Sequence, residues 1–396
     1  MSPTSSANGT DREPPTQQPR IALVLGGGGL KGFAHIGALQ ALEARGLRPT
    51  IYAGSSIGSL MAAAYACGVS TEEMEERARA LQRRDLFRIN HVGMVMERMS
   101  SPSLYLEGPL RELVRAVVPH RRFSDLPVPV LVNTVDLERG TQVVWGLPGL
   151  DDAWVDDAVY ASCALPGFFP PGMVRDRSCV DGGTVDNLPS TFPISLGADV
   201  VIGVDVGSAE IAPVANVDGL GFAAIFMRAA TTMMNALQGR HLSRHATPPM
   251  LLVRPAIFHL DWFTFGHAAE LIEAGRVAME EALESLDVCM HAPDGIYPRR
   301  AVRVTVDRAR CIGCGICVSM APDLMRLDDE RLAYADPEVV DWSPADGGFV
   351  RHCPTRAIVA HDAVTGQLAD NAEQISIERT ERPRIRRRAV GARRPA

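Results

Sequence analysis

The stretch that most constrains the fold of this chain is residues 21–68. It contains a short apolar strand (21–25), four successive glycines (26–29) and an apolar helix (33–45). A second short strand (50–53) and a sharp turn into another helix (54–58) follow. Glycine-rich turns therefore follow two successive strands. Because open α/β sheets place their chemistry at the carboxyl ends of their strands, we expect a functional site at these two turns.

The second turn, Gly54-Ser55-Ser56-Ile57-Gly58, fits the pattern G-x-S-x-G. In such an elbow the glycines keep side chains out of a tight strand-to-helix corner, and the serine hydroxyl is displayed at the start of the helix. A helix N-terminus favours developing negative charge, which suits a nucleophilic serine. The same pentapeptide also occurs as an ordinary turn, so by itself it only nominates Ser56.

The first turn, Gly27-Gly28-Gly29-Leu30-Lys31-Gly32, fits the dinucleotide pattern G-x-G-x-x-G. That use requires an acidic residue about 20 positions later, at the end of the next strand, and residues 52–56 contain none. A P-loop does not fit either, because Lys31 is followed by Gly32. A run of backbone N–H groups beside a serine elbow is better explained as an oxyanion hole, with nucleotide binding as the weaker alternative.

The remainder of residues 21–286 alternates strands and helices. Strands are predicted within 123–146, at 178–180 and at 198–206, and helices at 107–118, 157–171, 222–237 and 267–286. The stretch 198–206 is continuously apolar, as in parallel strands that are covered on both faces. The pattern predicts an α/β fold with a mostly parallel sheet and helices on both faces.

A serine hydroxyl needs a base to accept its proton. No histidine is framed by turn residues that would display it, whereas Asp181 ends a short strand and is followed by Gly182 and Gly183. A partly desolvated carboxylate held against Ser56 could serve as that base. Taken alone, Asp-Gly-Gly is more often a simple turn.

Four blocks occur in order: GGGGLKG, GSSIG, ASCALPGFFPP and DGGTVDNLP. With them the chain resembles the patatin-like phospholipases over residues 21–286. The resemblance implies a three-layer α/β/α fold and a serine–aspartate dyad that hydrolyses phospholipid or other acyl-ester lipids without a cofactor. It implies Ser56 as nucleophile and Asp181 as base. It also implies an oxyanion hole formed by Gly27, Gly28, Gly29, Lys31 and Gly32. The supporting glycines of the elbow and of the turn after Asp181 are Gly54, Gly58, Gly182 and Gly183.

A second motif, Cys311-x2-Cys314-x2-Cys317, is followed at a distance by Cys353-Pro354. This arrangement favours an iron–sulfur cluster over zinc, whose sites usually contain two separated cysteine pairs. The ligands of a second cluster are missing, because Ala321 stands at the fourth place of the run. We expect one 4Fe–4S cluster; the presence of Cys314 makes 3Fe–4S the weaker option. Residues 301–370 resemble bacterial single-cluster ferredoxins, a small α+β module of two hairpins and two helices.

Composition limits the other possibilities. A net charge of −7 and a pI near 5.8 argue against bulk nucleic-acid binding. No apolar stretch reaches the ~20 residues of a membrane span, and the polar N-terminus has no signal-peptide core. We expect a cytoplasmic protein, with peripheral contact at the inner membrane face as an option. We expect a disordered arm (1–20), a hydrolase domain (21–286), a linker (287–300), an iron–sulfur domain (301–370) and a basic disordered tail (371–396).

The leading functional hypothesis is a lipid acyl hydrolase whose iron–sulfur domain serves electron transfer or redox control. One alternative is an electron carrier that meets a ferredoxin reductase through acidic residues 328–330, with the hydrolase domain docking to lipid. Another gives the cluster a purely structural role. A lipid acyltransferase would use the same dyad, with an alcohol in place of water.

Overall fold

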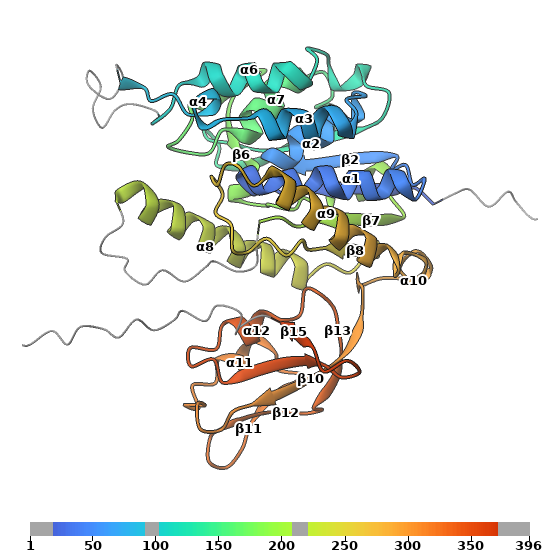
Figure 1. Ribbon diagram of the computed structural model, residues 1–396, viewed down its shortest axis with the longest axis vertical. Helices are drawn as coiled ribbons and strands as arrows, with labels where there is room; N and C mark the ends of the chain where they lie inside the picture. Colours follow the sequence, from blue (N-terminus) through green and yellow to red (C-terminus); the bar gives the residue numbers. More distant parts are fainter. Residues whose placement is uncertain (1–18, 92–102, 208–220, 371–396) are drawn as a thin grey trace, which may run out of the picture.

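The computed structural model of the 396-residue chain describes residues 19–91, 103–207 and 221–370 (Figure 1). The expected tail, and the expected arm apart from its last two residues, lie outside these ranges. In the described part, a large α/β body is followed by a smaller sheet-containing body below it in Figure 1.

The large body is built on a nine-stranded sheet in the order β5-β6-β3-β2-β1-β7-β8-β9, with β4 paired to β3. The pairs among β3, β2, β1, β7, β8 and β9 are parallel, whereas β4, β5 and β6 pair in antiparallel fashion. The strands are β1 (Ile21–Leu25), β2 (Ile51–Ser55), β3 (Val130–Asp136), β4 (Thr141–Trp145), β5 (Gly172–Val174), β6 (Arg177–Asp181), β7 (Val200–Val204), β8 (Met250–Val253) and β9 (Ile296–Tyr297).

The central strands are apolar throughout because both of their faces are covered. In β1, Leu23 and Leu25 pack into one core cluster, and Ala22 and Val24 pack into a second cluster on the opposite face. This alternation follows from the two-residue period of a strand. The neighbouring strand β2 begins opposite Ala22, so the turns after β1 and β2 lie at the same edge of the sheet.

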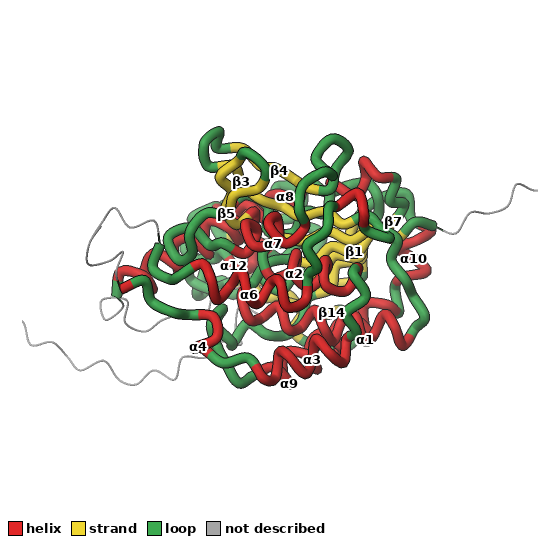
Figure 2. The backbone as a smooth tube through the Cα atoms, turned by 90° about the horizontal axis from the view of Figure 1, so that it is seen from above, coloured by secondary structure: helices red, strands yellow, loops and turns green. Residues whose placement is uncertain are grey.

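Most helices cover one face of the sheet. Seen from above, α1, α3 and α9 lie along one side of the strands (Figure 2). Among the described residues, the full set of helices on this face is α1 (Ala34–Ala44), α2 (Ile57–Ala66), α3 (Thr71–Ala80), α4 (Arg83–Leu86), α6 (Glu107–Val117), α7 (Val155–Cys163), α9 (Ala268–Leu283) and α10 (Leu286–His291), with the 3-10 turns η1 (Gly29–Phe33) and η3 (Phe123–Asp125). Gly37 and Gly275 allow α1 and α9 to touch, since a Cβ on either would lie 1.8 Å from a backbone oxygen of the other helix.

The opposite face is covered more thinly. It carries α8 (Phe222–Ser243) and the short turns η4 (Gly182–Thr184) and η5 (Phe192–Leu196). The core cluster on this face includes Leu188, Leu242 of α8 and Val144 of β4, and Ala345 of the smaller body packs against it. The result is an α/β fold with a mostly parallel central sheet.

The smaller body has a four-stranded antiparallel sheet, β13-β10-β14-β15, and a separate hairpin, β11-β12. Two hairpins were expected; a full sheet forms instead because β10 pairs with both β13 and β14. Its elements are β10 (Arg300–Val306), α11 (Ile316–Met320), β11 (Met325–Leu327), β12 (Ala333–Ala335), β13 (Val339–Trp342), α12 (Gly348–Arg351), β14 (Ile358–Asp362) and β15 (Leu368–Asp370).

The stretch 287–300, expected as a linker, contains most of α10 and the edge strand β9, which pairs with β8. The two bodies also touch through Arg254, whose guanidinium donates to the Pro344 carbonyl and to Asp205 Oδ2, the latter at 3.0 Å. Among the described helices, none combines the length and apolar character that a bilayer crossing requires.

Candidate active site

Ser56 stands between β2 and α2 in a strained conformation, with φ 53° and ψ −130°. Side chains other than glycine rarely adopt positive φ, and such residues persist where their surroundings enforce them. The flanking glycines supply that enforcement: a Cβ on Gly58 would lie 2.0 Å from the Leu25 carbonyl oxygen, and one on Gly54 would lie 2.5 Å from the backbone of Gly58. The elbow geometry expected from the pentapeptide is present.

Asp181 lies beside Ser56 at the end of β6, which pairs with β3. Asp181 Oδ1 accepts a hydrogen bond from Gly183 N at 2.8 Å, and the neighbouring Ser56 hydroxyl interacts with the same carboxylate. Burial raises the pKa of Asp181 to about 6, although the Ser56 hydroxyl and the Gly183 N–H act to lower it. A carboxylate with a pKa near neutrality can accept a proton from a serine far better than an ordinary exposed one.

The glycines after Asp181 are required by close packing. A Cβ on Gly182 would lie 2.4 Å from the Asn133 carbonyl oxygen, and one on Gly183 would lie 2.6 Å from Asn187 Oδ1. Asn133 also donates through Nδ2 to the Asp186 carbonyl at 2.7 Å. Side chains larger than hydrogen at either glycine would push Asp181 away from Ser56.

Two supporting residues were not found from the sequence. The Ser56 N–H donates to Ser162 Oγ at 2.9 Å, and Ser162 in turn donates to the Asn133 carbonyl at 2.7 Å. Ser162 is fully buried on α7 and fixes the backbone of the elbow. It stands within the ASCALPG block, but nothing in that block indicates which side chain turns inward.

The glycine turn faces the elbow, and only part of it is available to a ligand. The Gly27 N–H donates to the Asn187 carbonyl at 3.1 Å, and Asn187 Nδ2 donates back to the Gly27 carbonyl at 2.9 Å. The expected role of Gly27 as an oxyanion donor therefore needs correction, because its N–H is used within the fold. Within the described residues, the N–H groups of Gly28 and Gly29 have no acceptor, and Gly29 lines the cleft described below.

Lys31 and Gly32, the other expected members of the oxyanion hole, do not line that cleft. The Lys31 side chain is buried, which lowers its pKa to about 8, while Asp261 and Asp205 act to raise it. A Cβ on Gly32 would lie 2.4 Å from Ile57, so this glycine lets η1 pack against α2. Both residues shape the turn from behind.

A deep apolar cleft opens above Ser56 and Asp181, with about 1760 Å³ of empty space that is partly open to solvent. Its walls come from α2, α3, α4, α6 and the loop before α9. The apolar lining includes Leu60, Met61, Met74, Leu81, Leu86, Phe87, Leu110, Leu113, Val117, Cys163, Phe169, Trp262 and Phe263. A cleft of this size and polarity suits a long hydrocarbon chain.

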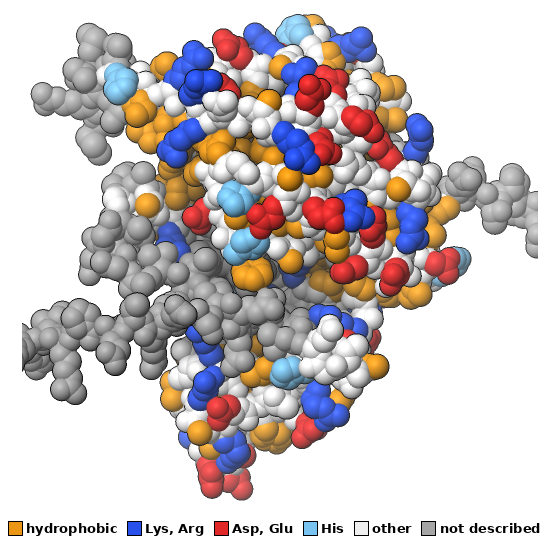
Figure 3. All heavy atoms as spheres, viewed as in Figure 1, with side chains coloured by type: hydrophobic (Ala, Val, Ile, Leu, Met, Phe, Trp, Pro, Cys, Tyr) orange, Lys and Arg blue, Asp and Glu red, His pale blue; other side chains and the backbone are white. Residues whose placement is uncertain are grey.

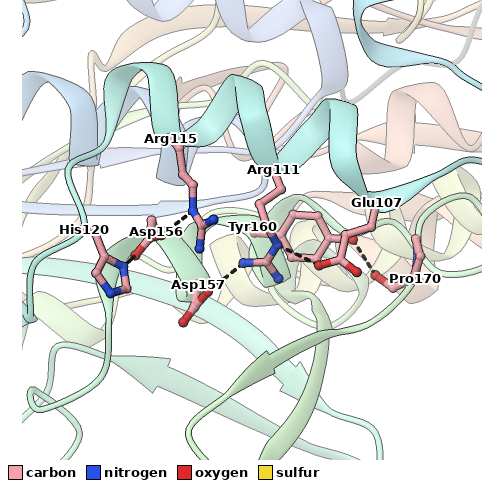
Figure 4. A network of polar contacts seen from close by, with 8 residues as sticks. All are labelled: Glu107, Arg111, Arg115, His120, Asp156, Asp157, Tyr160 and Pro170. Atoms are coloured by element: carbon pink, nitrogen blue, oxygen red, sulfur yellow. Dashed lines mark hydrogen bonds and ion pairs between the residues drawn. The ribbon is translucent and has the colours of Figure 1, made fainter.

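The outer wall, α6, is held to α7 by a row of charged contacts (Figure 4). Arg111 contacts Asp157 at 2.6 Å and lies 4.3 Å from the centre of the Tyr160 ring. Asp156, which is buried, accepts from Arg115 at 3.0 Å and contacts His120 Nδ1 at 2.8 Å. Since α7 also carries Ser162, the same helix positions the elbow and anchors the cleft wall.

No histidine is among the residues that line the cleft in the described part of the chain. The nearest to the glycine turn, His35, is fully buried with Nε2 2.8 Å from the Gly26 carbonyl oxygen. Burial lowers the pKa of His35 to about 4, so the ring stays neutral. A role for histidine as the base has no geometric support, and Asp181 is the titratable group in contact with Ser56.

In the smaller body, Cys311, Cys314, Cys317 and Cys353 line one cavity with about 330 Å³ of empty space. Backbone N–H groups point at two of the sulfurs: Ala333 N donates to Cys311 Sγ at 3.4 Å, and Ala357 N donates to Cys353 Sγ at 3.3 Å. Such contacts stabilise thiolates and tune iron–sulfur clusters.

Across the described ranges, no three His, Cys, Asp or Glu side chains lie close enough to share one metal ion. A cubic cluster does not require this, because each thiolate binds a separate iron. Four cysteines around one small cavity, with N–H groups directed at their sulfurs, fit such a cluster.

Two family models match parts of the two bodies. The family model described as Patatin-like phospholipase matches residues 23–192. The chain contains a patatin-like phospholipase domain. A second family model, described as 4Fe-4S single cluster domain, matches residues 304–360. The patatin-like match spans the glycine turn, the elbow and Asp181, and the second match spans all four cavity cysteines.

Relatives of the patatin-like domain occur in bacteria and eukaryotes. An uncharacterised NTE family protein of Mycobacterium tuberculosis is 34% identical over 203 residues, covering 50% of this chain and 52% of that protein. Human patatin-like phospholipase domain-containing protein 6 is 32% identical over 201 residues, covering 48% of this chain and 14% of that protein. Lysophospholipase NTE1 of Mycosarcoma maydis is 34% identical over 197 residues, covering 48% of this chain and 10% of that protein. The chain thus spans about half the length of the first relative and less of the others. The crystal structure of VipD from Legionella pneumophila aligns with a TM-score of 0.41 and 15% identity, covering 68% of this chain and 67% of that one.

Proposed function

We propose that the patatin-like domain hydrolyses acyl esters of lipids, with Ser56 as nucleophile and Asp181 as general base. The observation that carries this proposal is the pairing of a conformationally strained serine with a buried carboxylate whose pKa the serine influences, both lining one apolar cleft. The names of two relatives, a lysophospholipase and a patatin-like phospholipase domain-containing protein, support phospholipids or lysophospholipids as the substrate class.

The reaction follows from the positions of these groups. Ser56 Oγ attacks the acyl carbonyl carbon as its proton moves to Asp181. The N–H groups of Gly28 and Gly29 stabilise the oxyanion, helped by the N-terminus of α2. The proton then passes to the departing alcohol oxygen. Asp181 next removes a proton from water, which attacks the acyl-serine ester and releases the fatty acid, and the proton returns to Ser56.

The test compares the purified full chain with Ser56→Ala and Asp181→Asn on lysophosphatidylcholine and on soluble p-nitrophenyl esters. Ser55→Ala is the matched control, since Ser55 is the adjacent buried serine and its hydroxyl has no hydrogen-bond partner among the described residues. We expect both dyad variants to lose activity by at least a thousandfold, in the range (about 10³ to 10⁶) seen for loss of a nucleophile, and Ser55→Ala to retain it. Hydrolysis that survives in pure Ser56→Ala would overturn the proposal.

The same residues could transfer the acyl group to an alcohol instead of water. Adding a lipid alcohol acceptor to the hydrolysis assay and measuring the new ester separates the two outcomes. A tight, dry approach to the acyl-serine would favour transfer, whereas the cleft is partly open to solvent, which favours water. We therefore propose hydrolysis as the main reaction.

We further propose that residues 301–370 form a domain that holds one 4Fe–4S cluster on Cys311, Cys314, Cys317 and Cys353. When bound, the cluster supplies one-electron redox chemistry. The contact of Arg254 with both bodies supports redox control of the hydrolase over an independent electron carrier. A surface for a ferredoxin reductase is weaker than expected, because Arg308 pairs with Asp328 at 2.5 Å and with Glu330 at 2.9 Å. All eight cysteines are unbridged, which supports a cytoplasmic location.

Iron and acid-labile sulfide analysis of the wild type and of Cys353→Ala tests the ligand set, and esterase assays before and after reduction with dithionite test control. Loss of iron in the variant with the hydrolase still folded supports the ligand assignment. If esterase activity is equal in both redox states, redox control is wrong, and electron transfer or a structural role remains.

A further inference from the structure

One face of the helix α8 (Phe222–Ser243) packs against the turn that follows Asp181. Met234 and Gln238 on this face are buried, and Gln238 Oε1 accepts from Asn187 Nδ2 at 3.3 Å. One turn further along, His241 Nδ1 lies 3.4 Å from Asp186 Oδ1. The spacing of three and four residues places these side chains in one row. The inner face of α8 thus bears directly on the segment that follows Asp181.

The outer face of the same helix is apolar and exposed. Ile225, Met233 and Leu237 expose 45%, 60% and 37% of their surface, and Ala229 and Ala236 between them are also exposed. With 3.6 residues per turn, these positions fall within about a third of the helix circumference. A helix on a water-exposed surface normally turns polar residues outward. An outward apolar stripe therefore indicates a surface that meets another phase or molecule.

Charge on α8 selects the partner. Residues 219–260 contain no Asp or Glu, although the whole chain carries a net charge of −7. Within and just after the helix stand Arg228, Arg240 and Arg244. By helical spacing Arg240 lies on the apolar stripe itself, and it is exposed. An apolar stripe on a helix that carries arginines and no acidic residue of its own is complementary to an anionic lipid surface, into which amphipathic helices settle with their apolar face.

The position of α8 relative to the cleft fits this partner. Met227, near the start of the helix, packs against the same core cluster as Trp262 and Phe263, and both of these line the cleft. Hydrophobic side chains gather on the left side of the large body in Figure 3, the side toward which the start of α8 points in Figure 1. A surface that contacts α8 would lie close to the cleft that receives acyl chains.

We propose that α8 is an interfacial helix that docks the enzyme on anionic phospholipid surfaces, with Ile225, Met233 and Leu237 inserted at the headgroup boundary and Arg240 at the phosphates. The proposal rests on the lipid hydrolase function for its biological purpose. Its physical basis, the exposed apolar stripe and the absence of acidic residues from α8 itself, is independent of the chemistry. The docked helix would also hold the Asp186–Asn187 turn in place.

Vesicle co-sedimentation of the full chain tests the docking, in a Ser56→Ala background so that no lipid is consumed. Vesicles of phosphatidylcholine alone and of phosphatidylcholine mixed with phosphatidylglycerol are compared. The test variant is Ile225→Glu combined with Met233→Glu. The matched control is Val288→Glu on α10, which replaces a side chain on another helix that is as exposed (61%) as that of Met233 (60%).

We expect the α8 variant to lose binding to the phosphatidylglycerol vesicles by more than tenfold and the control to keep it. Arg240→Ala, which leaves the apolar stripe intact, should weaken that binding by about fivefold, as expected for one basic residue near an anionic surface. Unchanged binding in all three variants overturns the proposal. It is also overturned if light scattering shows a wild-type dimer that the α8 variant converts to a monomer while vesicle binding persists, because the stripe is then an interface between copies.

Failure of the docking and failure of the hydrolase function give different results. If soluble esters are cleaved but vesicles are not bound, the docking inference is wrong and the hydrolase stands. If vesicles are bound through α8 but no ester is cleaved by the chain with Ser56 intact, the hydrolase proposal is wrong and the docking stands.

Discussion

Replacing Asp181 with asparagine should abolish hydrolysis and make the protein more stable. The Asp181 carboxyl is fully buried, and this burial raises its pKa from 3.8 to about 6, so the carboxylate is ionised above that pH. Each pKa unit corresponds to about 1.4 kcal/mol, so the ionised side chain costs about 3 kcal/mol of folding free energy. Asparagine keeps an acceptor for Ser56 and for the Gly183 N–H without carrying this charge.

The gain depends on pH with a defined sign. Because the pKa of Asp181 is higher in the folded state than in the unfolded state, the folded protein loses stability as pH rises from about 4 to about 6. The advantage of Asp181→Asn should therefore be complete at pH 8 and absent below about pH 4. For a domain of this size, about 3 kcal/mol corresponds to a rise in melting temperature of roughly 5 °C.

Calorimetric melting of wild type and variant at several pH values measures this difference. Asp136 is a control with the opposite sign. Burial would raise its pKa, but hydrogen bonds from Arg139, from the backbone and from Arg177 bring it below the usual value. Asp136→Asn should therefore lower the melting temperature at pH 8. A destabilised Asp181→Asn protein, or a gain that is the same at pH 4 and pH 8, would refute the account of Asp181 as a buried base under electrostatic strain.

Three further predictions concern the site and its support. The kcat/KM for a soluble ester should rise with pH around a midpoint near 6, as Asp181 ionises, and a flat profile would exclude it as the base. Ser56→Gly and Ser56→Ala should both be inactive. In urea titrations the free energy of unfolding of the glycine variant should be about 1 kcal/mol higher than that of the alanine variant, because glycine relieves the strain of the positive φ. Equal free energies of unfolding would contradict the strain. Gly37→Ala should destabilise the protein by about 3 kcal/mol, since its Cβ would meet the Ile272 carbonyl. Its control is Gly239→Ala, in open space on α8, which should be neutral or stabilising in the same titration.

Local sequence was sufficient for the elements whose geometry depends on a few adjacent residues. The elbow at Ser56, the turn after Asp181 and the cysteine run are each specified by glycines or ligands at fixed spacing. The order of motifs also predicted a mostly parallel sheet, because strands joined through helices must run in the same direction. These features were predicted without knowing which segments lie side by side.

The three-dimensional structure decided which groups are available for chemistry. The N–H of Gly27 is consumed by Asn187, which lies 160 residues away along the chain, and no local pattern reports such a contact. The contacts through which Ser162 and Asn133 support the elbow are also between residues far apart in the chain, so no local pattern reports them either. The outward direction of the α8 stripe was equally hidden, because an apolar helix reads the same whether its faces are covered or exposed. Adjacent residues thus determined the turns and ligands, whereas burial and long-range hydrogen bonds, which depend on the whole packed chain, decided the pKa of Asp181 and the identity of its partners.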